Sequence, residues 1–467
     1  MIRVPKAPFE GIGSMTAATV PAAASITAGS RPKLSIAQIL QMNLGFLGLQ
    51  FSFGLQQANM SPIWGYLGAE EKNFAWLGIA GPLTGLIVQP IIGSLSDRTS
   101  SRWGRRTPYF VVGALMCALG LFLMPLSASV LMAFSLLFLL DVGNNVTMEP
   151  YRAYVNDRLE ADQRGFGFLS QSAFTGLAQC LAYLSPTLLV TLFGLSRDAT
   201  QGGGIPTFTL VSFWIGSVLS LGTILWSITR VPELKLPEAE RARLAALPKT
   251  PAATLGEILG AIRDMPRAMR SMAWMSLFQW YAMSGYWGYV TNSISRSVYG
   301  TADASTAAYR EAVLTNGQVG AFFNLIAFLA ALAMAPLARR LGAGRLHTVC
   351  LTLSGCAMLA IPMIAQKELL FVAAIGIGLG WGSIMGNPYI ILADTIPPER
   401  TGVYMGIFNM FICLPMLIFA ATMSFAYEPL LGGDARNVLR VSGVCMMLAA
   451  IAVWRIKEGR GSAVAAG

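Results

Sequence analysis

Charged residues are scarce in this chain, and histidine is almost absent. Only 12% of its 467 residues are charged, 54% are hydrophobic, and the mean hydropathy is +0.57. An average soluble domain carries about twice that share of charge. The one histidine and the scattered hydroxyl residues form neither a nucleophile–base set nor a cluster of metal ligands. The composition therefore disfavours an enzyme, a metal site or a cofactor, and it predicts an integral membrane protein.

Cysteine is also rare. The six cysteines show no CxxC spacing, and all of them fall within apolar stretches: Cys117, Cys180, Cys350, Cys356, Cys413 and Cys445. Disulfide frameworks and zinc sites need pairs or clusters of cysteines at regular spacings. Neither kind of site is expected here.

Long hydrophobic runs are abundant. A helix needs about 20 apolar residues to cross about 30 Å of hydrocarbon, and runs of this length recur in two groups separated by a polar stretch. The first group covers 37–59, 74–95, 107–126, 129–151, 165–193 and 208–229, and the second covers 271–293, 313–336, 346–366, 369–393, 401–423 and 435–455. This pattern predicts an all-α membrane protein of twelve transmembrane helices.

The basic residues mark one side of the membrane. Most of the 33 lysines and arginines fall in the loops that an even number of crossings places on the same side as both termini. The positive-inside rule puts that side in the cytoplasm. The net charge of +10 is then an effect of topology, and nucleic-acid binding is not expected. Basic loops and compact termini favour the inner (plasma) membrane of a bacterium, with membrane lipids around a monomer.

The apolar runs divide the chain into five parts. We expect a disordered cytoplasmic arm at 1–36, without a signal peptide. An N-terminal six-helix bundle at 37–229 and a C-terminal six-helix bundle at 271–455 are expected to be joined by a cytoplasmic linker at 230–270. A cytoplasmic tail at 456–467 ends the sequence.

A weak repeat relates the ends of the fourth and tenth runs. EPYRAYVNDRLEADQRGFGF resembles NPYIILADTIPPERTGVYMG, since both carry Pro-Tyr followed by an aspartate (Asp157, Asp394) and an arginine (Arg164, Arg400). A duplicated six-helix unit accounts for the match, and a coincidence of helix-end chemistry is the alternative. Duplicated halves joined by a long loop are typical of the major facilitator architecture, in which the substrate binds between the halves.

The fourth run carries polar residues in an apolar setting. In LLDVGNNVTMEPYR, Asp141 lies near the middle of the bilayer, and Asn145, Glu149 and Arg152 fall on the same helical stripe. A charge at that depth costs at least about 2.5–3.5 kcal/mol, so such residues mark functional cavities. Loss of hydration favours the protonated form of a buried carboxylate, which makes Asp141 the candidate proton-coupling residue. A structural hydrogen bond is the alternative.

Arg152 is too far from Asp141 to be its counter-ion, because their separation in sequence corresponds to about 16 Å along a helix. Glu149, three residues before Arg152, is the predicted partner of that arginine. Both are candidate substrate-binding residues, together with Asn144 and Asn145. Snorkelling to lipid headgroups is the alternative for Arg152.

Several stretches of the N-terminal half form a recognisable set of motifs: LDVGNNVTMEPYRAYVND, GLQFSFGLQQANMSPIWGYLGA and GPLTGLIVQPIIGSLSDRTSSRWGRRTPYF, with looser counterparts NGQVGAFFN and RSVYG in the C-terminal half. The set resembles the sucrose–proton symporters of plants and their animal and bacterial relatives, within the glycoside–pentoside–hexuronide carriers of the major facilitator superfamily. The resemblance implies a glycoside–proton symporter. In it, Asp141 stands at the family's protonated aspartate and Arg152 at its transport-essential arginine.

The chain departs from this family at two places. Val290, Asn292 and Ser297 surround Arg296 where plant members carry acidic residues, so a plant-like role of those acids does not transfer. Glu149 is an acid that the plant pattern lacks. It leaves open a second protonatable group or a different proton stoichiometry.

Further candidate sugar contacts lie on several runs. Asn43, Gln50 and Gln57 recur every seven residues and so share one helix face, and amides suit sugar hydroxyls because they both donate and accept. Interhelical hydrogen bonds are the alternative use of such amides. Aromatic rings suit the apolar face of a pyranose, although tryptophans also anchor helix ends at the membrane interface. The C-terminal candidates are Gln279, Trp280, Asn324, Trp381 and Asn387.

The stretch GSLSDRTSSRWGRR resembles the gating signature of the same superfamily. Its candidate gating residues are Asp97, Arg98, Arg105 and Arg106. A basic loop that only sets topology is the alternative. His347 is predicted at the cytoplasmic start of the ninth helix and is not expected to carry the proton, despite its convenient titration range.

These features predict a carrier that imports a disaccharide, sucrose in the first place, together with a proton. The alternatives are the same fold carrying maltose, another glycoside or a monosaccharide, coupling to sodium, and a non-transporting sugar receptor. Sodium would favour a second carboxylate close to Asp141, and Glu149 lies about 12 Å further along the helix.

Overall fold

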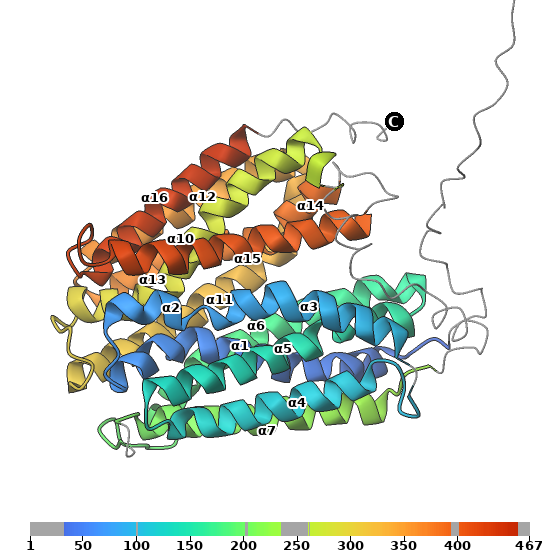
Figure 1. Ribbon diagram of the computed structural model, residues 1–467, viewed down its shortest axis with the longest axis horizontal. Coiled ribbons are helices and arrows are strands. Elements are labelled where there is room, and N and C mark those ends of the chain that lie inside the picture. Colours follow the sequence, from blue (N-terminus) through green and yellow to red (C-terminus); the bar gives the residue numbers. More distant parts are fainter. Residues whose placement is uncertain are drawn as a thin grey trace, which may run out of the picture.

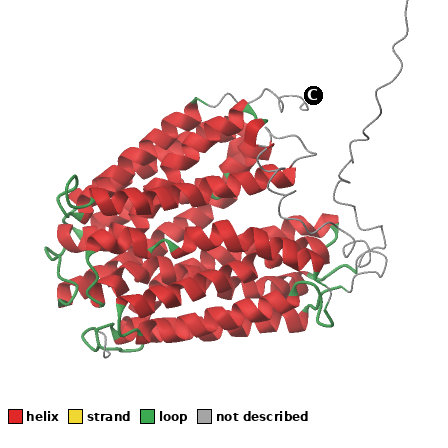
Figure 2. Ribbon diagram, viewed as in Figure 1, coloured by secondary structure: helices red, strands yellow, loops and turns green. Residues whose placement is uncertain are grey.

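The computed structural model describes residues 32–99, 101–200, 204–234, 260, 262–393 and 401–455. Every regular element within these ranges is a helix (Figures 1 and 2). The expected tail, nearly all of the expected arm and residues 235–259 and 261 of the expected linker lie outside the described residues, as do Asp394 and Arg400 of the repeat.

The N-terminal half is built from long helices, two of which begin at a serine cap. Ser35 accepts from the Gln38 backbone while the Gln38 side chain accepts from the Ser35 backbone, and Ser129 accepts from the Met132 backbone, so orphan N–H groups are satisfied. The elements are α1 (Ile36–Tyr66), η1 (Glu71–Asn73), α2 (Phe74–Leu77), α3 (Ala80–Arg98), α4 (Thr107–Leu123), η2 (Met124–Leu126), α5 (Val130–Arg158), α6 (Ala161–Thr191) and α7 (Thr207–Arg230).

The C-terminal half follows the same plan, except that one predicted helix is broken. Its elements are α10 (Arg267–Ser297), α11 (Ala307–Leu341), α12 (Ala343–Ala360), η3 (Ile361–Met363), α13 (Lys367–Ile384), α14 (Asn387–Ala393), α15 (Thr401–Ala426) and α16 (Ala435–Trp454). The run 369–393 predicted one helix, whereas α13 and α14 are separate. Pro388 has no N–H to donate to the Ile384 carbonyl oxygen, so the helical hydrogen-bond pattern is interrupted at the turn of Met385 and Gly386.

Ten helices in the described part are both long and apolar enough to cross a membrane. α1 and α10 are not among them, yet each has 31 residues, or about 46 Å, against about 30 Å of hydrocarbon. Their lower hydropathy comes from the polar side chains that both helices bring to the middle of the molecule. With these two, the membrane-spanning helices number twelve, and the chain is an all-α membrane protein.

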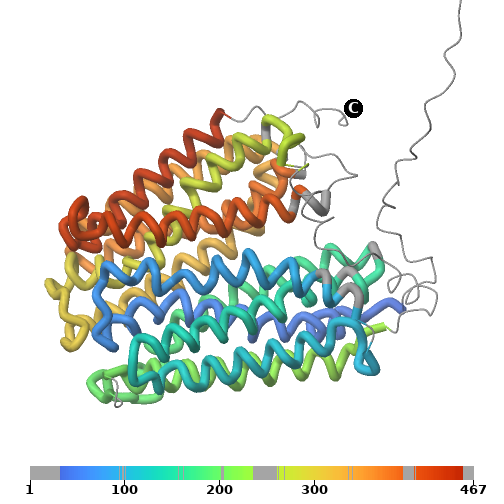
Figure 3. Tube along the Cα trace, in the orientation of Figure 1, coloured from blue at the N-terminus to red at the C-terminus, as the bar shows by residue number. Residues whose placement is uncertain are grey.

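The helices form two blocks that run side by side. In Figures 1 and 3 the N-terminal half, coloured blue to green, lies below the C-terminal half, coloured yellow to red. The blocks meet where α6 packs against α11 and α3 packs against α15, and α1 contacts α10 between these two seams. The centre of the molecule is therefore lined by helices from both halves.

The two ends of the bundle differ. We call the end where α1 begins the basic end, because it carries Arg105, Arg106 and Arg158. We call the opposite end, which includes 67–73, 192–200, 204–206, 298–306 and 427–434, the closed end. In Figures 1 and 3 the two halves lie close together at the closed end, on the left, and diverge toward the basic end, on the right.

Gly113 allows α4 and α5 to approach closely. A Cβ at this position would lie 2.1 Å from Thr147 Oγ1 and 2.7 Å from the carbonyl oxygen of Gly143. We expect Gly113→Val to lower the free energy of unfolding by about 1–3 kcal/mol or more, because the two backbones must separate. The measurement is thermal unfolding in detergent. The matched control is Gly222→Val in α7, where an added Cβ meets nothing within 4 Å, and equal losses in both variants would contradict the expectation.

Candidate functional site

Asp141 lies in the middle of α5 and is only 4% exposed. Gln56 of α1 donates from Nε2 to Asp141 Oδ1 at 3.1 Å. On the other side, a Cβ at Gly81 of α3 would lie 3.6 Å from Asp141 Oδ2, so the α3 backbone passes close to that oxygen. Both neighbours are uncharged. No opposite charge is therefore in contact with Asp141 among the described contacts.

A chain of hydrogen bonds between amide side chains links α5 to the C-terminal half. Asn145 donates to the Asp141 carbonyl oxygen at 2.8 Å and to Thr84 Oγ1 at 2.9 Å. Gln89 of α3 donates to Asn145 Oδ1 at 2.6 Å and accepts from Asn409 of α15 at 3.2 Å. Asn145 thus fixes the position of α5 next to the seam between the halves. Sequence reasoning missed Gln89 and Asn409, although each is an amide within an otherwise apolar run.

The predicted ion pair between Glu149 and Arg152 is confirmed at 3.1 Å. The Arg152 side chain is 52% exposed, and that of Glu149 is 29% exposed. Tyr389 of α14, in the opposite half, interacts electrostatically with both. The pair therefore lies toward the basic end, accessible to solvent, and faces the C-terminal half.

A cavity of about 140 Å³ lies between the halves. Its walls come from α1, α2 and α3 on one side and from α10 and α15 on the other. The polar and aromatic members are Gln56, Gln57, Ser61, Trp64, Phe74, Ser284, Trp287 and Phe419. The cavity is smaller than the about 300–1,000 Å³ of a typical ligand site.

The amides predicted along α1 do not share one role. Gln57 lines the cavity, as expected for a ligand-binding residue. Gln50 instead accepts from Gln179 of α6 at 3.2 Å, and Asn43 donates to the carbonyl oxygens of Ile39 and Gly167. These two hold α1 to α6, the alternative use of such amides.

Asn144 and Asn324 also point away from the cavity. Asn144 is fully buried and accepts from the Cys117 thiol of α4 at 3.2 Å. Asn324 donates to the Gly320 carbonyl oxygen one turn earlier in α11. Both amides are used in helix packing.

Gln279 and Asn387 belong to a buried chain of hydrogen bonds that includes the single histidine. His347 Nε2 lies 3.0 Å from Gln279 Oε1, and His347 Nδ1 lies 2.7 Å from Ser383 Oγ. Ser383 Oγ accepts from Asn387 at 2.8 Å, so its own hydrogen is free to donate to Nδ1, and Nε2–H then donates to Gln279. One tautomer of neutral His347 satisfies the chain, which ties α10, α12, α13 and α14 together.

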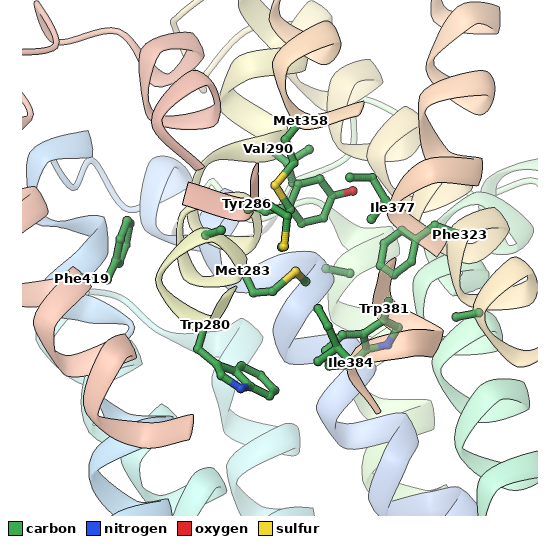
Figure 4. Packing of buried hydrophobic residues seen from close by; sticks show 14 of the residues in the cluster. Trp280, Met283, Tyr286, Val290, Phe323, Met358, Ile377, Trp381, Ile384 and Phe419 are labelled. Carbon is green, nitrogen blue, oxygen red and sulfur yellow. The ribbon is translucent and has the colours of Figure 1, made fainter. Parts of the chain in front are cut away.

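Tryptophans gather beside the cavity in the C-terminal half. The ring centroids of Trp280 and Trp381 are 6.2 Å apart, and Trp287 lies 5.3 Å from Trp381. Figure 4 shows Trp280 and Trp381 packed among apolar side chains such as Met283 and Ile384. Of these three tryptophans, only Trp287 lines the cavity, and its buried Nε1–H has no hydrogen-bond partner among the described residues. Trp287 was not selected from the sequence, although it follows Trp280 by seven residues and so lies on the same helix face.

An ionic network closes the end opposite the basic end. Glu71 of η1 accepts from Arg296 Nη1 at 2.8 Å, from Asn292 Nδ2 at 2.6 Å, and from the Tyr427 hydroxyl. Asp434 lies 3.9 Å from Arg296 Nε. We call these five residues the Glu71 network. Glu71 comes from the N-terminal half, so the network supplies Arg296 with an acid from across the interface.

Charges in the Glu71 network are well matched. Burial raises the pKa of Asp434, yet hydrogen bonds from Arg436 and the charge of Arg296 outweigh it and leave that pKa below its ordinary value. Burial and the nearby charge of Glu71 raise the pKa of the Tyr427 hydroxyl, which therefore keeps its hydrogen and donates it. Asp434 therefore supplies a negative charge to the network, and Tyr427 supplies a hydrogen-bond donor.

Further ion pairs cross between the halves at the closed end. They are Lys72–Glu428 at 3.4 Å, Arg197–Glu311 at 2.5 Å and Arg310–Asp198 at 2.8 Å. At the basic end, by contrast, Arg105 and Arg106 contact Asp157 at 2.5 and 3.2 Å within the N-terminal half. Among the described residues, these ion pairs therefore tie the halves together at the closed end.

The predicted gating residues are described only in part. The side chains of Asp97 and Arg98 lie outside the described part of the chain. Arg106 also donates to Ser96 Oγ at 2.5 Å, and Glu233 accepts from the backbone N–H groups of Arg105 and Arg106 at 2.7 Å. Asp157 and Glu233 thus fix the start of α4, and a gating role remains a prediction.

Comparison with known proteins supports the fold. Residues 15–420 match the family model described as the Major Facilitator Superfamily. The chain is 24% identical to a sucrose transport protein of Arabidopsis thaliana over 90% of this chain and 91% of that protein. It is also 24% identical to a general alpha-glucoside permease of Schizosaccharomyces pombe, over 57% of this chain and 49% of that protein.

Solved structures of transporters share this fold. The nucleoside transporter NupG superposes with a TM-score of 0.64 at 15% identity, over 90% of this chain and 100% of that one. An auto-inhibited peptide transporter of the POT family gives a TM-score of 0.64 at 14% identity, over 90% of this chain and 96% of that one.

Proposed function

The chain belongs to the Major Facilitator Superfamily, a family of transporters and not of enzymes, and we propose that within it this protein imports a disaccharide, sucrose in the first place, together with a proton. The observation that carries the proposal is the position of Asp141. It is a buried carboxylate whose hydrogen-bond partner, Gln56, lines the cavity between the halves. One contact thus joins a proton site to a substrate site.

Orientation in the membrane is part of the proposal. The basic end faces the cytoplasm and the closed end faces the outside, in agreement with the positive-inside rule. The protein acts as a monomer in the inner membrane. The halves, 37–229 and 271–455, rock against each other around the central cavity.

The transport cycle follows from the two ends. In the orientation whose cavity opens to the outside, at the end that we call the closed end, Asp141 takes up a proton. Protonation removes a buried charge and allows sugar to bind. The Glu71 network then forms and joins the halves at the closed end, as its interhalf contacts support. Sugar and proton leave through the basic end, past Arg152, whose half-exposed side chain faces Tyr389 of the other half.

Sugar binding is proposed to use both kinds of group found at the cavity. Gln57 and Ser61 offer donors and acceptors for hydroxyls. Trp287 offers a ring face for the apolar side of a pyranose and an unpartnered N–H. Trp280 and Trp381 support that ring from behind. Arg152 and Glu149 line the way out.

A second candidate is the same carrier with another α-glucoside, maltose above all, as the main substrate. The relative named as a general alpha-glucoside permease favours keeping it. Sodium coupling remains an alternative to the proton, and the described partners of Asp141 give it little support, since they are an amide and a glycine backbone.

Uptake of labelled sucrose into proteoliposomes tests the proposal. With an acidic exterior and an alkaline lumen, we expect accumulation that collapses when a protonophore is added and that is unchanged when sodium is replaced by choline. Maltose and glucose are added as competitors. No uptake of sucrose under a pH gradient, or uptake that needs sodium, would contradict the proton-coupled reading, and stronger competition by maltose would select the second candidate.

A further inference from the structure

We propose that Gln56 couples protonation of Asp141 to sugar binding through the orientation of its side-chain amide. This inference rests on the proposed function, because it requires Asp141 to exchange a proton and the cavity to hold a sugar. It adds a residue that contacts both Asp141 and the proposed sugar site, and that the seven-residue amide pattern of α1 does not include.

Gln56 contacts Asp141 and also lines the cavity. Its Nε2 donates to Asp141 Oδ1 at 3.1 Å, in a contact buried from solvent. The same side chain forms part of the cavity wall, and Ser284 and Trp287 of α10 form the wall on the opposite half. The amide therefore lies between the carboxylate and the space that the sugar is proposed to occupy.

The protonation state of Asp141 decides which end of the amide it binds. An ionised carboxylate only accepts, so it holds the NH₂ group of Gln56. A protonated Asp141 carries one O–H and donates it to Gln56 Oε1 when the amide turns by half a rotation. The proton stays on Asp141 and no covalent bond in Gln56 changes. The turn releases the NH₂ group toward the cavity, where it donates to a sugar hydroxyl oxygen.

Few other groups near Asp141 can titrate. Cys117 of α4 interacts electrostatically with Asp141, and its buried thiol donates to Asn144. From α1 and α3 the neighbours are Gln56 and Gly81, which do not titrate. Among the described residues, Asp141 is thus the acid whose protonation changes the hydrogen bond of Gln56.

Charged groups on the same helix and on α6 are occupied elsewhere. Glu149 and Arg152 of α5 pair with each other at 3.1 Å. Asp162 of α6 lies at the basic end and pairs with Lys33 at 2.6 Å. These pairs leave the protonation of Asp141 as the event that the Gln56 amide follows.

Gln56 and Gln57 form a matched pair for the experiment. Both are amides of α1 that line the cavity, and of the two only Gln56 contacts Asp141. The assay is exchange of labelled for unlabelled sucrose in proteoliposomes with equal pH on both sides, which gives an apparent affinity at each pH. Wild type is expected to bind sucrose more tightly at acidic than at alkaline pH.

The two variants are expected to differ in the shape of the pH profile. Gln56→Leu should reduce the ratio of acidic to alkaline affinity by about tenfold, the factor that corresponds to one hydrogen bond to a charged group. Gln57→Leu should weaken affinity at every pH and keep the ratio of the wild type. Gln56→Asn keeps an amide one methylene too short to reach Asp141 and should behave as Gln56→Leu.

The outcomes separate the two proposals. A variant is folded when it elutes as a single peak and keeps the melting temperature of the wild type in detergent. If Gln56→Leu is not folded, Gln56→Asn is used in its place. A wild-type pH profile in the folded Gln56 variant overturns the coupling role while the proposed function stands. Loss of the profile in Gln57→Leu as well would also overturn it. Absence of sucrose exchange in wild type overturns the proposed function and this inference with it.

Discussion

Asp141→Asn is expected to abolish sugar accumulation driven by a pH gradient while exchange of labelled for unlabelled sugar continues. Asparagine has nearly the size of aspartate and can still hydrogen-bond Gln56, whose Nε2 lies 3.1 Å from Asp141 Oδ1 in the wild type. It has no proton to exchange, and so it holds the site in a neutral state. With one proton per sugar, each pH unit supports about tenfold accumulation, and the variant should remain near one.

The control for this experiment is Asp162→Asn. Asp162 is a carboxylate at the basic end whose side chain is 57% exposed and which pairs with Lys33 at 2.6 Å. Exposed ion pairs contribute little, so this variant should accumulate sugar as the wild type does. Full accumulation by Asp141→Asn would move proton coupling to another acid, with Glu149 as the first to examine.

The polar stripe of α5 could be predicted because it depends on helix geometry alone. Residues three and four apart share a face in any α-helix, so the sequence was enough to pair Glu149 with Arg152, and their 3.1 Å contact confirms it. The twelve membrane segments were predictable for a similar reason, since each can be recognised from the length of its own apolar run. The functional roles of Asp141 and Arg152 stay proposals.

The partners across helices could not be predicted in this way. Gln56 and Gln57 are adjacent, and which of them reaches Asp141 depends on how α1 lies against α5. The seven-residue spacing selected Gln57, Gln50 and Asn43, of which only Gln57 lines the cavity. Asn43 and Gln50 are indistinguishable from ligands in sequence because helix packing needs the same amides.

The closed end was the least predictable region. Glu71 begins the short helix η1, and its partner Arg296 comes from the other half of the chain. The departure of the residues around Arg296 from the plant pattern was the only signal in the sequence. It indicated that local acids were missing, and only the fold showed that Glu71 supplies one from the N-terminal half.

Glu71→Gln is expected to open the closed end. The carboxylate accepts from Arg296, Asn292 and Tyr427, and the Glu71 and Arg296 side chains are only 15% and 16% exposed. Loss of its charge leaves Arg296 with Asp434 at 3.9 Å as its nearest acid. Hydrogen bonds to charged groups contribute about 1.5–3 kcal/mol, so the equilibrium between the two orientations should shift by about tenfold or more toward the one open at this end.

Labelling of a cysteine at Ser284 measures that shift. Ser284 lines the cavity and bonds only to the Trp280 carbonyl oxygen of its own helix among its described contacts, so Ser284→Cys disturbs the interface little. A membrane-impermeant thiol reagent is added on the side of the closed end, and the chain without Ser284→Cys gives the background from the native cysteines. Glu71→Gln should raise the labelling rate by about tenfold or more.

The neighbouring Lys72→Gln is the matched control, because its pair with Glu428 at 3.4 Å joins the same two halves but is exposed. Its labelling rate should stay near that of the parent. The double variant Glu71→Gln with Arg296→Gln should label more slowly than Glu71→Gln alone, since removal of both charges leaves no buried ion without a partner. Equal rates in Glu71→Gln and Lys72→Gln would show that the Glu71 network does not control the opening.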